Sequence, residues 1–138
     1  MIRIKLTSLS VDDQDKAERF YVDRLGFAVK QNIAMGAVRY LTVVSPAEPD
    51  GTELSIEPGG LRPEVAAYHA WLKEQRIPST AFQGDDIDAE HARLEAEGVR
   101  FTAAPADMGP VRAATLDDTC GNLIMLYALT VAPHTASA

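Results

Sequence analysis

The chain carries the same order of local signals twice. In the first half, Asp12-Asp13 precedes apolar residues at helical spacing, and Gly26 follows them. In the second half, Asp85-Asp86 and Gly98 enclose a similar run. Acidic residues favour a helix N-terminus and glycine favours the position just after a helix, so each half predicts one helix. Neither half can bury a sheet face alone, so the two halves are expected to pair.

Alternating apolar and polar residues predict strands around both helices. The expected strands are Ile2–Val11, Phe27–Ile33, Ala37–Ser45 and Thr52–Glu57, then Ser79–Gly84, Val99–Ala103, Val111–Leu116 and Leu123–Leu129. Pro63–Gln75 reads as a helix between the halves, with its proline in the first turn. The chain thus predicts one α+β domain over residues 1–129, in which two βαβββ modules form a curved mixed sheet around a cleft. The modules are residues 1–60 and 79–129, residues 61–78 are the linker helix, and residues 130–138 are expected to be a flexible tail.

Composition excludes several kinds of protein. Thirteen Lys and Arg face twenty Asp and Glu, a net charge of −7, which disfavours a nucleic-acid partner. No apolar run is long enough to span a membrane, and the N-terminus does not look like a secretory signal. The single cysteine, Cys120, makes no internal disulfide, so we expect a cytoplasmic protein.

A family resemblance rests on several short motifs in a set order. Val11-Asp12-Asp13 leads into Ala17, Phe20-Tyr21 and Leu25-Gly26-Phe27. Gly51-Thr52-Glu53-Leu54, Asp85-Asp86-Ile87, and Asp117-Asp118 before Cys120-Gly121-Asn122 support it. Over about Ile2–Leu129, the chain resembles the vicinal-oxygen-chelate superfamily, which contains glyoxalase I, extradiol dioxygenases and bleomycin-resistance proteins. The resemblance implies the glyoxalase/bleomycin-resistance fold and a homodimer in which the modules of two chains complete or cover each other's clefts.

The resemblance also implies four positions that bind a divalent metal in the metal-dependent members. Carried over by motif spacing, they fall on Leu6, Glu53, Ser79 and Met125. Only Glu53 is an ordinary ligand, so no metal site and no cofactor are expected. The three histidines lie outside the cleft strands, and the pair His91 and Glu95 is more typical of a solvated helix face.

The cleft is expected to be largely apolar with a few polar groups. Glu53 has two interpretations. It is a buried carboxylate that binds a cationic or hydroxylated ligand or acts as a general base, or it is a carboxylate satisfied by a neighbouring Arg or by water. The candidate ligand-binding residues, with Glu53 also the candidate catalytic residue, are Leu6, Ser8, Glu53, Ser79, Ala81, Gln83, Met125 and Tyr127. Such a mixture suits a small organic molecule, although the same side chains would also close the cleft upon themselves.

Three other groups have a structural and a functional interpretation. Cys120 is expected to be a structural thiol, because no histidine is near it in the sequence to activate it. Trp71 is expected to pack between the modules rather than cover a cleft or a dimer contact. Arg39 and Arg112 are interpreted as edge-strand charges rather than an anion clamp.

These observations favour a glyoxalase-like, bleomycin-resistance-like protein without the metal site, which binds a small organic molecule and forms a homodimer. The alternatives are a metal-dependent lyase, isomerase or dioxygenase of the same superfamily, a metal-free enzyme using Glu53 as base, and an interaction module with no ligand. Whether the chain is an enzyme stays open at this point.

Overall fold

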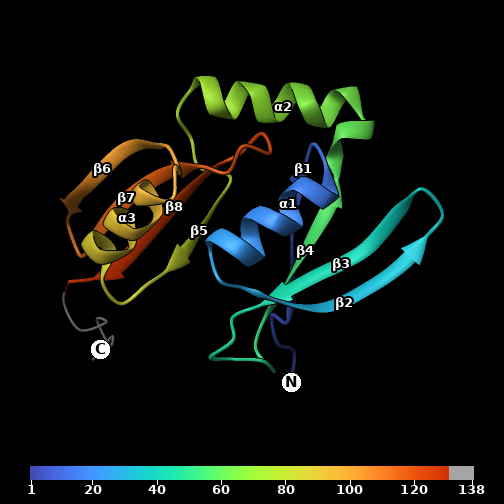
Figure 1. Ribbon diagram of the computed structural model, residues 1–138, viewed down its shortest axis with the longest axis horizontal. Helices are drawn as coiled ribbons and strands as arrows, with labels where there is room; N and C mark the ends of the chain where they lie inside the picture. The colour runs from blue at the N-terminus through green and yellow to red at the C-terminus, as the bar shows by residue number, and fades with distance from the viewer. Residues whose placement is uncertain (131–138) are drawn as a thin grey trace.

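The predicted repeat is present in a computed structural model, which describes residues 1–130. Each half of the chain has the order strand, helix, three strands, and the linker helix α2 lies between the halves along the top of the molecule (Figure 1). The elements are β1 (Leu6–Val11), α1 (Gln14–Arg19), η1 (Phe20–Arg24), β2 (Ala28–Met35), β3 (Val38–Val44), β4 (Glu53–Pro58), η2 (Gly59–Leu61), α2 (Pro63–Glu74), β5 (Thr80–Gln83), α3 (Ile87–Ala96), β6 (Phe101–Met108), β7 (Val111–Asp117) and β8 (Leu123–Leu129). The α+β prediction is confirmed. We call β1 to β4 with α1 the first unit, and β5 to β8 with α3 the second unit.

The two units share one strand topology. The first sheet has the order β1-β4-β3-β2 and the second β5-β8-β7-β6. In each, the first strand pairs in parallel with the last, and the other neighbours are antiparallel. The first and last strand of a unit therefore lie side by side, although most of the unit separates them in the sequence.

Both unit helices begin and end as their sequence signals predict. The carboxylates of Asp13 and Asp86 accept hydrogen bonds from backbone N–H groups three residues on, each at 3.0 Å. Gly26 and Gly98 follow the helices with φ of +85° and +89°, a conformation that favours glycine. The helix of the first unit departs from expectation in one respect, because it continues beyond α1 as the π-helical segment η1, which buries the successive aromatic residues Phe20 and Tyr21.

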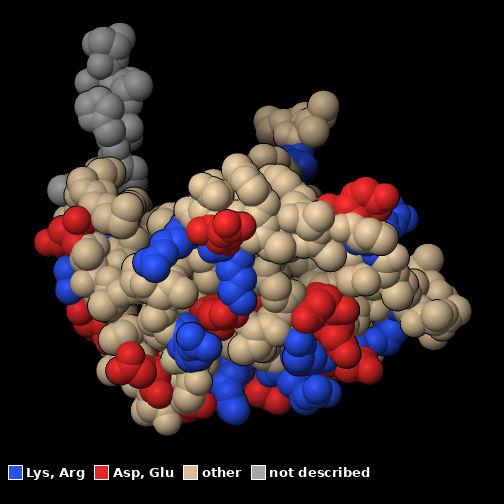
Figure 2. Space-filling model, turned by 90° about the horizontal axis from the view of Figure 1, so that it is seen from above, with Lys and Arg blue, Asp and Glu red and all other residues tan. Residues whose placement is uncertain are grey.

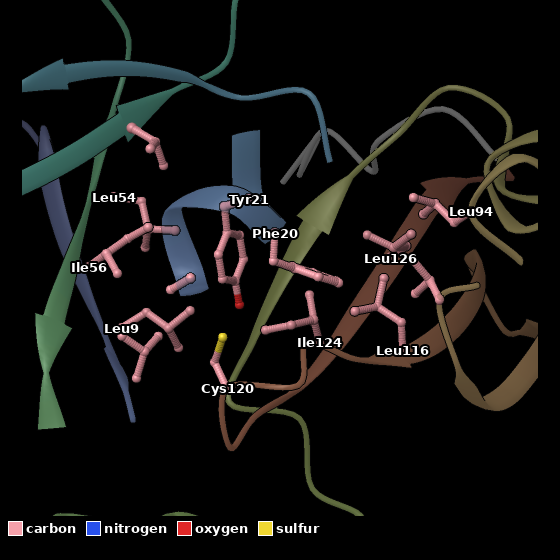
Figure 3. Close-up of a cluster of buried hydrophobic side chains, with 14 of the residues drawn as sticks. Leu9, Phe20, Tyr21, Leu54, Ile56, Leu94, Leu116, Cys120, Ile124 and Leu126 are labelled. Carbon is pink, nitrogen blue, oxygen red and sulfur yellow. The ribbon is translucent and has the colours of Figure 1, made fainter. Parts of the chain in front are cut away.

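One hydrophobic core joins the units. Leu9 and Ile56 of the first sheet and Ile124 and Leu126 of the second belong to the same buried cluster. Figure 3 shows Tyr21 of η1 between the first two residues and Ile124. Burial of apolar surface is the main favourable contribution to folding, so each unit stabilises the other.

The linker helix α2 is packed more loosely than expected. Leu72 is its one buried residue, and Trp71 is 51% exposed. The prediction that Trp71 packs between the modules is therefore wrong. Val65, Ala66 and Ala70 of the helix instead line a hollow between α2 and the units.

Some element boundaries differ from the predictions. The first strand begins at Leu6 rather than Ile2, and β6 continues to Met108 rather than ending at Ala103. Pro105 obscured that continuation, but β6 is an edge strand, where proline is tolerated. The expected division at residues 60 and 78 stays a prediction, and residues 131–138 of the expected tail lie outside the described residues.

Candidate functional site

Each sheet has one face toward the core and one face away from it. On β1, Leu9 and Val11 are buried in the core, so the alternating residues Leu6, Ser8 and Ser10 lie on the opposite face. The register of the sheet places residues of the other strands beside them. We call this surface the first outer face; its members are Leu6, Ser8, Ser10, Gln31, Ile33, Met35, Tyr40, Thr42, Glu53, Ser55 and Glu57.

Glu53 is the first residue of β4 and lies at one end of the first outer face. It pairs in register with Leu6, which is 52% exposed. The Thr42 hydroxyl donates a hydrogen bond of 2.7 Å to the Glu53 carboxylate. Within residues 1–130, no Lys or Arg side chain forms an ion pair with Glu53. The carboxylate is therefore oriented by a neutral group and keeps its negative charge available on the face.

The second sheet has a corresponding outer face. Ala81 and Gln83 of β5 pair with Met125 and Tyr127 of β8, and these residues alternate with the core residues Phe82 and Leu126. Ser79 precedes β5, and its hydroxyl donates to the side-chain oxygen of Asn122 at 2.8 Å. The eight predicted ligand-binding residues thus form two groups: Leu6, Ser8 and Glu53 on the first outer face, and Ser79, Ala81, Gln83, Met125 and Tyr127 on or beside the second.

The four positions of the family's metal site do not make a donor set. Leu6 and Met125 offer an alkyl group and a thioether, and Ser79 is engaged with Asn122. The residue in register with Met125 is Ala81, not Ser79, so the neighbouring strand adds no ligand. Residues 1–130 contain no group of three or more His, Cys, Asp or Glu side chains arranged to hold a metal ion. These residues do not fit the divalent metal that the resemblance implies.

His91 and Cys120 lie away from both outer faces. The His91 ring contacts Phe101 with centroids 4.5 Å apart, and its Nε2 lies 3.2 Å from the Glu95 carboxylate. Cys120 is buried, and burial raises the pKa of its thiol to about 12, with the negative charge of Asp118 as a further cause. A thiol held neutral is a poor nucleophile, which agrees with a structural role.

A buried hydrogen-bond network that no sequence pattern predicts lies between the units. Asp118 is fully buried and its carboxylate accepts from the Tyr21 hydroxyl at 2.5 Å and from the Asn122 amide at 2.9 Å. The backbone N–H groups of Cys120 and Asn122 donate to its other oxygen. Asn122 also donates to the Ser10 carbonyl at 3.0 Å. The Asp-Asp-Thr-Cys-Gly-Asn turn was the only signal in the sequence, and it did not reveal the partner at Tyr21.

Arg39 and Arg112 have the same role in the two units. Arg39 lies on β3, an interior strand, and binds Asp15 and Glu18 of the α1 helix at 2.8 and 2.7 Å. Arg112 lies on β7, also interior, and its nearest bond to Asp88 of α3 is 2.6 Å. The edge-strand interpretation is therefore wrong. Each arginine ties its sheet to the helix that covers it, and these carboxylates raise the pKa of both guanidinium groups.

Charges of both signs mix on the surface seen from above in Figure 2. That face shows no large basic patch of the kind that nucleic acids require. No helix of residues 1–130 has the length and apolar character needed to cross a membrane.

The chain is similar in sequence to a known protein family and to a curated protein. The family model of the Glyoxalase/Bleomycin resistance protein/Dioxygenase superfamily matches residues 3–126. The uncharacterized protein YurT of Bacillus subtilis (strain 168) is 44% identical over 125 residues, which cover 91% of this chain and 98% of YurT.

Two solved structures show the same fold. UcmS2 has a TM-score of 0.77 and 28% identity, covering 92% of this chain and 98% of UcmS2. TnmS3, described as an antibiotic binding protein from Streptomyces sp. CB03234, has a TM-score of 0.72 and 26% identity, covering 94% and 98%.

Proposed function

The chain belongs to the Glyoxalase/Bleomycin resistance protein/Dioxygenase superfamily, and from that membership we propose that it is a binding protein without a metal. Its ligand is a small organic molecule with an apolar body and a positively charged group. Sequestration of such a molecule requires affinity and a shaped surface but no reacting group. The similarity to TnmS3, an antibiotic binding protein, supports a small-molecule ligand.

The observation that carries this proposal is the composition of the first outer face. Glu53 is the one ordinary metal ligand among the four family positions. Its carboxylate accepts a hydrogen bond from the Thr42 hydroxyl rather than pairing with a cation. Apolar side chains that are half or more exposed, Leu6, Ile33 and Met35, lie on the same face. An apolar surface with a few oriented polar groups is typical of a small-molecule site. Leu6 is the apolar residue in register with Glu53, and a carboxylate beside an apolar group favours a cationic ligand.

The proposal includes a homodimer and a cytoplasmic location. Exposed apolar residues on an open sheet face mark a surface that a ligand or a second chain covers. In the dimer, the outer faces of two chains would complete or cover each other. The cytoplasmic location is supported by Cys120 as the single cysteine.

The metal part of the proposal is tested by elemental analysis. Untagged protein is purified without chelator, incubated with Zn, Ni, Mn and Fe(II), and dialysed free of unbound metal. We expect metal far below one ion per chain. Near-stoichiometric metal would overturn the metal-free proposal and favour a lyase, isomerase or dioxygenase.

The ligand part is tested first with bleomycin, the antibiotic in the family's name, and then with a matched pair of probes. Naphthylmethylamine and naphthylmethanol have the same ring, but only the amine is cationic at neutral pH. We expect the amine to bind more tightly in a calorimetric titration. Glu53→Gln should weaken amine binding about tenfold, because a charge-assisted hydrogen bond becomes a neutral one.

The alcohol is the internal control for that variant, since its affinity should not change. Ala92→Gln, an exposed change on α3, is the matched control for the protein. Equal affinity of the wild-type protein for both probes would rule out Glu53 as the group that selects the ligand.

A further inference from the structure

A groove lies between α2 and the boundary of the two units, and it adjoins the first outer face at Ser10 and Glu57. Its main hollow has a volume of about 220 Å³. The linker helix contributes Val65, Ala66 and Ala70 to the wall, and the units contribute Val11 and Cys120. A second hollow of about 200 Å³ beside η2 shares Val65 and two other wall residues with the first. We call the two together the α2 groove.

The wall of the main hollow is apolar because of the residues on both sides of it. Alanines on the inner side of α2 leave space that larger side chains would fill. On the opposite side, burial keeps the Cys120 thiol neutral. Gly60 bounds the groove where η2 crosses the end of β1, and a Cβ there would overlap the Asp12 carbonyl oxygen. Glycine at this position keeps the backbones in contact and adds no side chain to the hollow.

Two basic residues border the apolar wall. Arg62 lines the hollow beside η2, and His69 lines the main hollow. Within residues 1–130, neither side chain makes a hydrogen bond or ion pair. The other charged residues that line the groove are already engaged. Lys16 lies 2.9 Å from Asp12, Asp117 lies 3.0 Å from Lys73, and the Ser55 hydroxyl donates to Glu57 at 3.4 Å.

We propose that the α2 groove binds a small organic carboxylate, distinct from the ligand of the outer faces. The apolar body of the molecule lies between Val65 and Val11, and its carboxylate binds the Arg62 guanidinium, with His69 as a hydrogen-bond donor. An apolar cavity of about 150 Å³ is enough to bind benzene in another protein, so the main hollow accommodates one ring. Arginine suits the charged end because its planar fork matches a carboxylate.

Benzoate and benzamide are the probes that test this site. They share a ring, but only benzoate carries a charge at neutral pH. Trp71 is the single tryptophan of the chain and lies on α2, so its fluorescence reports on this helix. We expect benzoate to change the Trp71 fluorescence saturably and benzamide to bind at least several times more weakly.

Two variants locate the binding. Ala70→Leu fills the hollow and should abolish the benzoate response, whereas the matched change Ala92→Leu on α3 should leave it intact. Arg62→Gln should weaken benzoate about tenfold and leave benzamide unchanged, since it removes a charge without removing apolar wall. The melting curve of each variant is compared with that of the wild-type protein, and similar curves verify that the variant folds.

The proposal is overturned if benzoate produces no saturable response, or if Ala70→Leu binds it as well as the wild-type protein does. It is also overturned if Arg62→Gln reduces the affinity for both probes equally. These results are separate from those for the outer faces, because the cationic naphthyl probe and the Glu53→Gln variant do not involve the α2 groove.

Discussion

At the residue scale, Tyr21 is the side chain whose substitution has the most direct predicted effect on stability. Its hydroxyl binds the buried Asp118 carboxylate, and its ring meets Phe82 of the second unit with centroids 6.3 Å apart. Tyr21→Phe keeps the ring but leaves a buried charge with one donor fewer. We expect a loss of about 1–3 kcal/mol of the free energy of unfolding, measured by urea denaturation. Tyr68→Phe, at an exposed ring, is the control and should cost little.

The same residue predicts how stability depends on alkaline pH. Burial first, and then the negative charge of Asp118, raise the pKa of Tyr21 well above its usual value of 10.0. The folded protein therefore holds this proton more tightly than the unfolded chain does. Its contribution is complete below about pH 10 and falls as the pH rises further. Melting temperatures should fall less steeply above that pH in Tyr21→Phe than in wild-type protein; equal slopes would contradict the assignment.

At the scale of elements, the crossing of η2 over the end of β1 is sensitive to a single methyl group. Gly60→Ala would place a Cβ against the Asp12 backbone, which cannot move as a flexible side chain can. We expect a loss of about 1–3 kcal/mol of the free energy of unfolding. Gly84→Ala is the matched control, because the nearest atom to its Cβ is the flexible Ile87 Cδ1 at 3.4 Å. If both variants unfolded at the same urea concentration, the result would contradict the prediction that the Asp12 backbone excludes a Cβ at position 60.

The sequence predicted elements well and contacts between elements poorly. Helix starts at Asp13 and Asp86 were predictable because capping is local, within three residues. The bond from Tyr21 to Asp118 joins residues 97 apart, and no local pattern encodes it. Arg39 was misread because strand order decides whether a strand is an edge, and strand order is a property of the whole sheet. For the site, alternation placed Leu6 and Glu53 on one face correctly, whereas the α2 groove depends on how three distant segments meet.

At the scale of the whole molecule, the outer faces predict self-association. Ile33 and Met35, 52% and 60% exposed, lie on the edge strand β2 of the first outer face. Light scattering should give twice the chain mass of 14.9 kDa for the wild-type protein. Ile33→Asp should shift the protein toward the monomer because it introduces a charge into an apolar contact, while Ala92→Asp on α3 should not. A wild-type monomer at every concentration would contradict the dimer.

The position of Tyr21 in the shared core also has a consequence for folding during synthesis. Synthesis completes the first unit while Ile124 and Asp118 have yet to be made. Until they are made, the apolar side of η1 is exposed, and its aromatic residues can form non-native contacts. Contacts between residues so distant in the chain close slowly. The second unit thus acts as the folding partner of the first, and the time between the two on the ribosome is when the protein is most prone to aggregate.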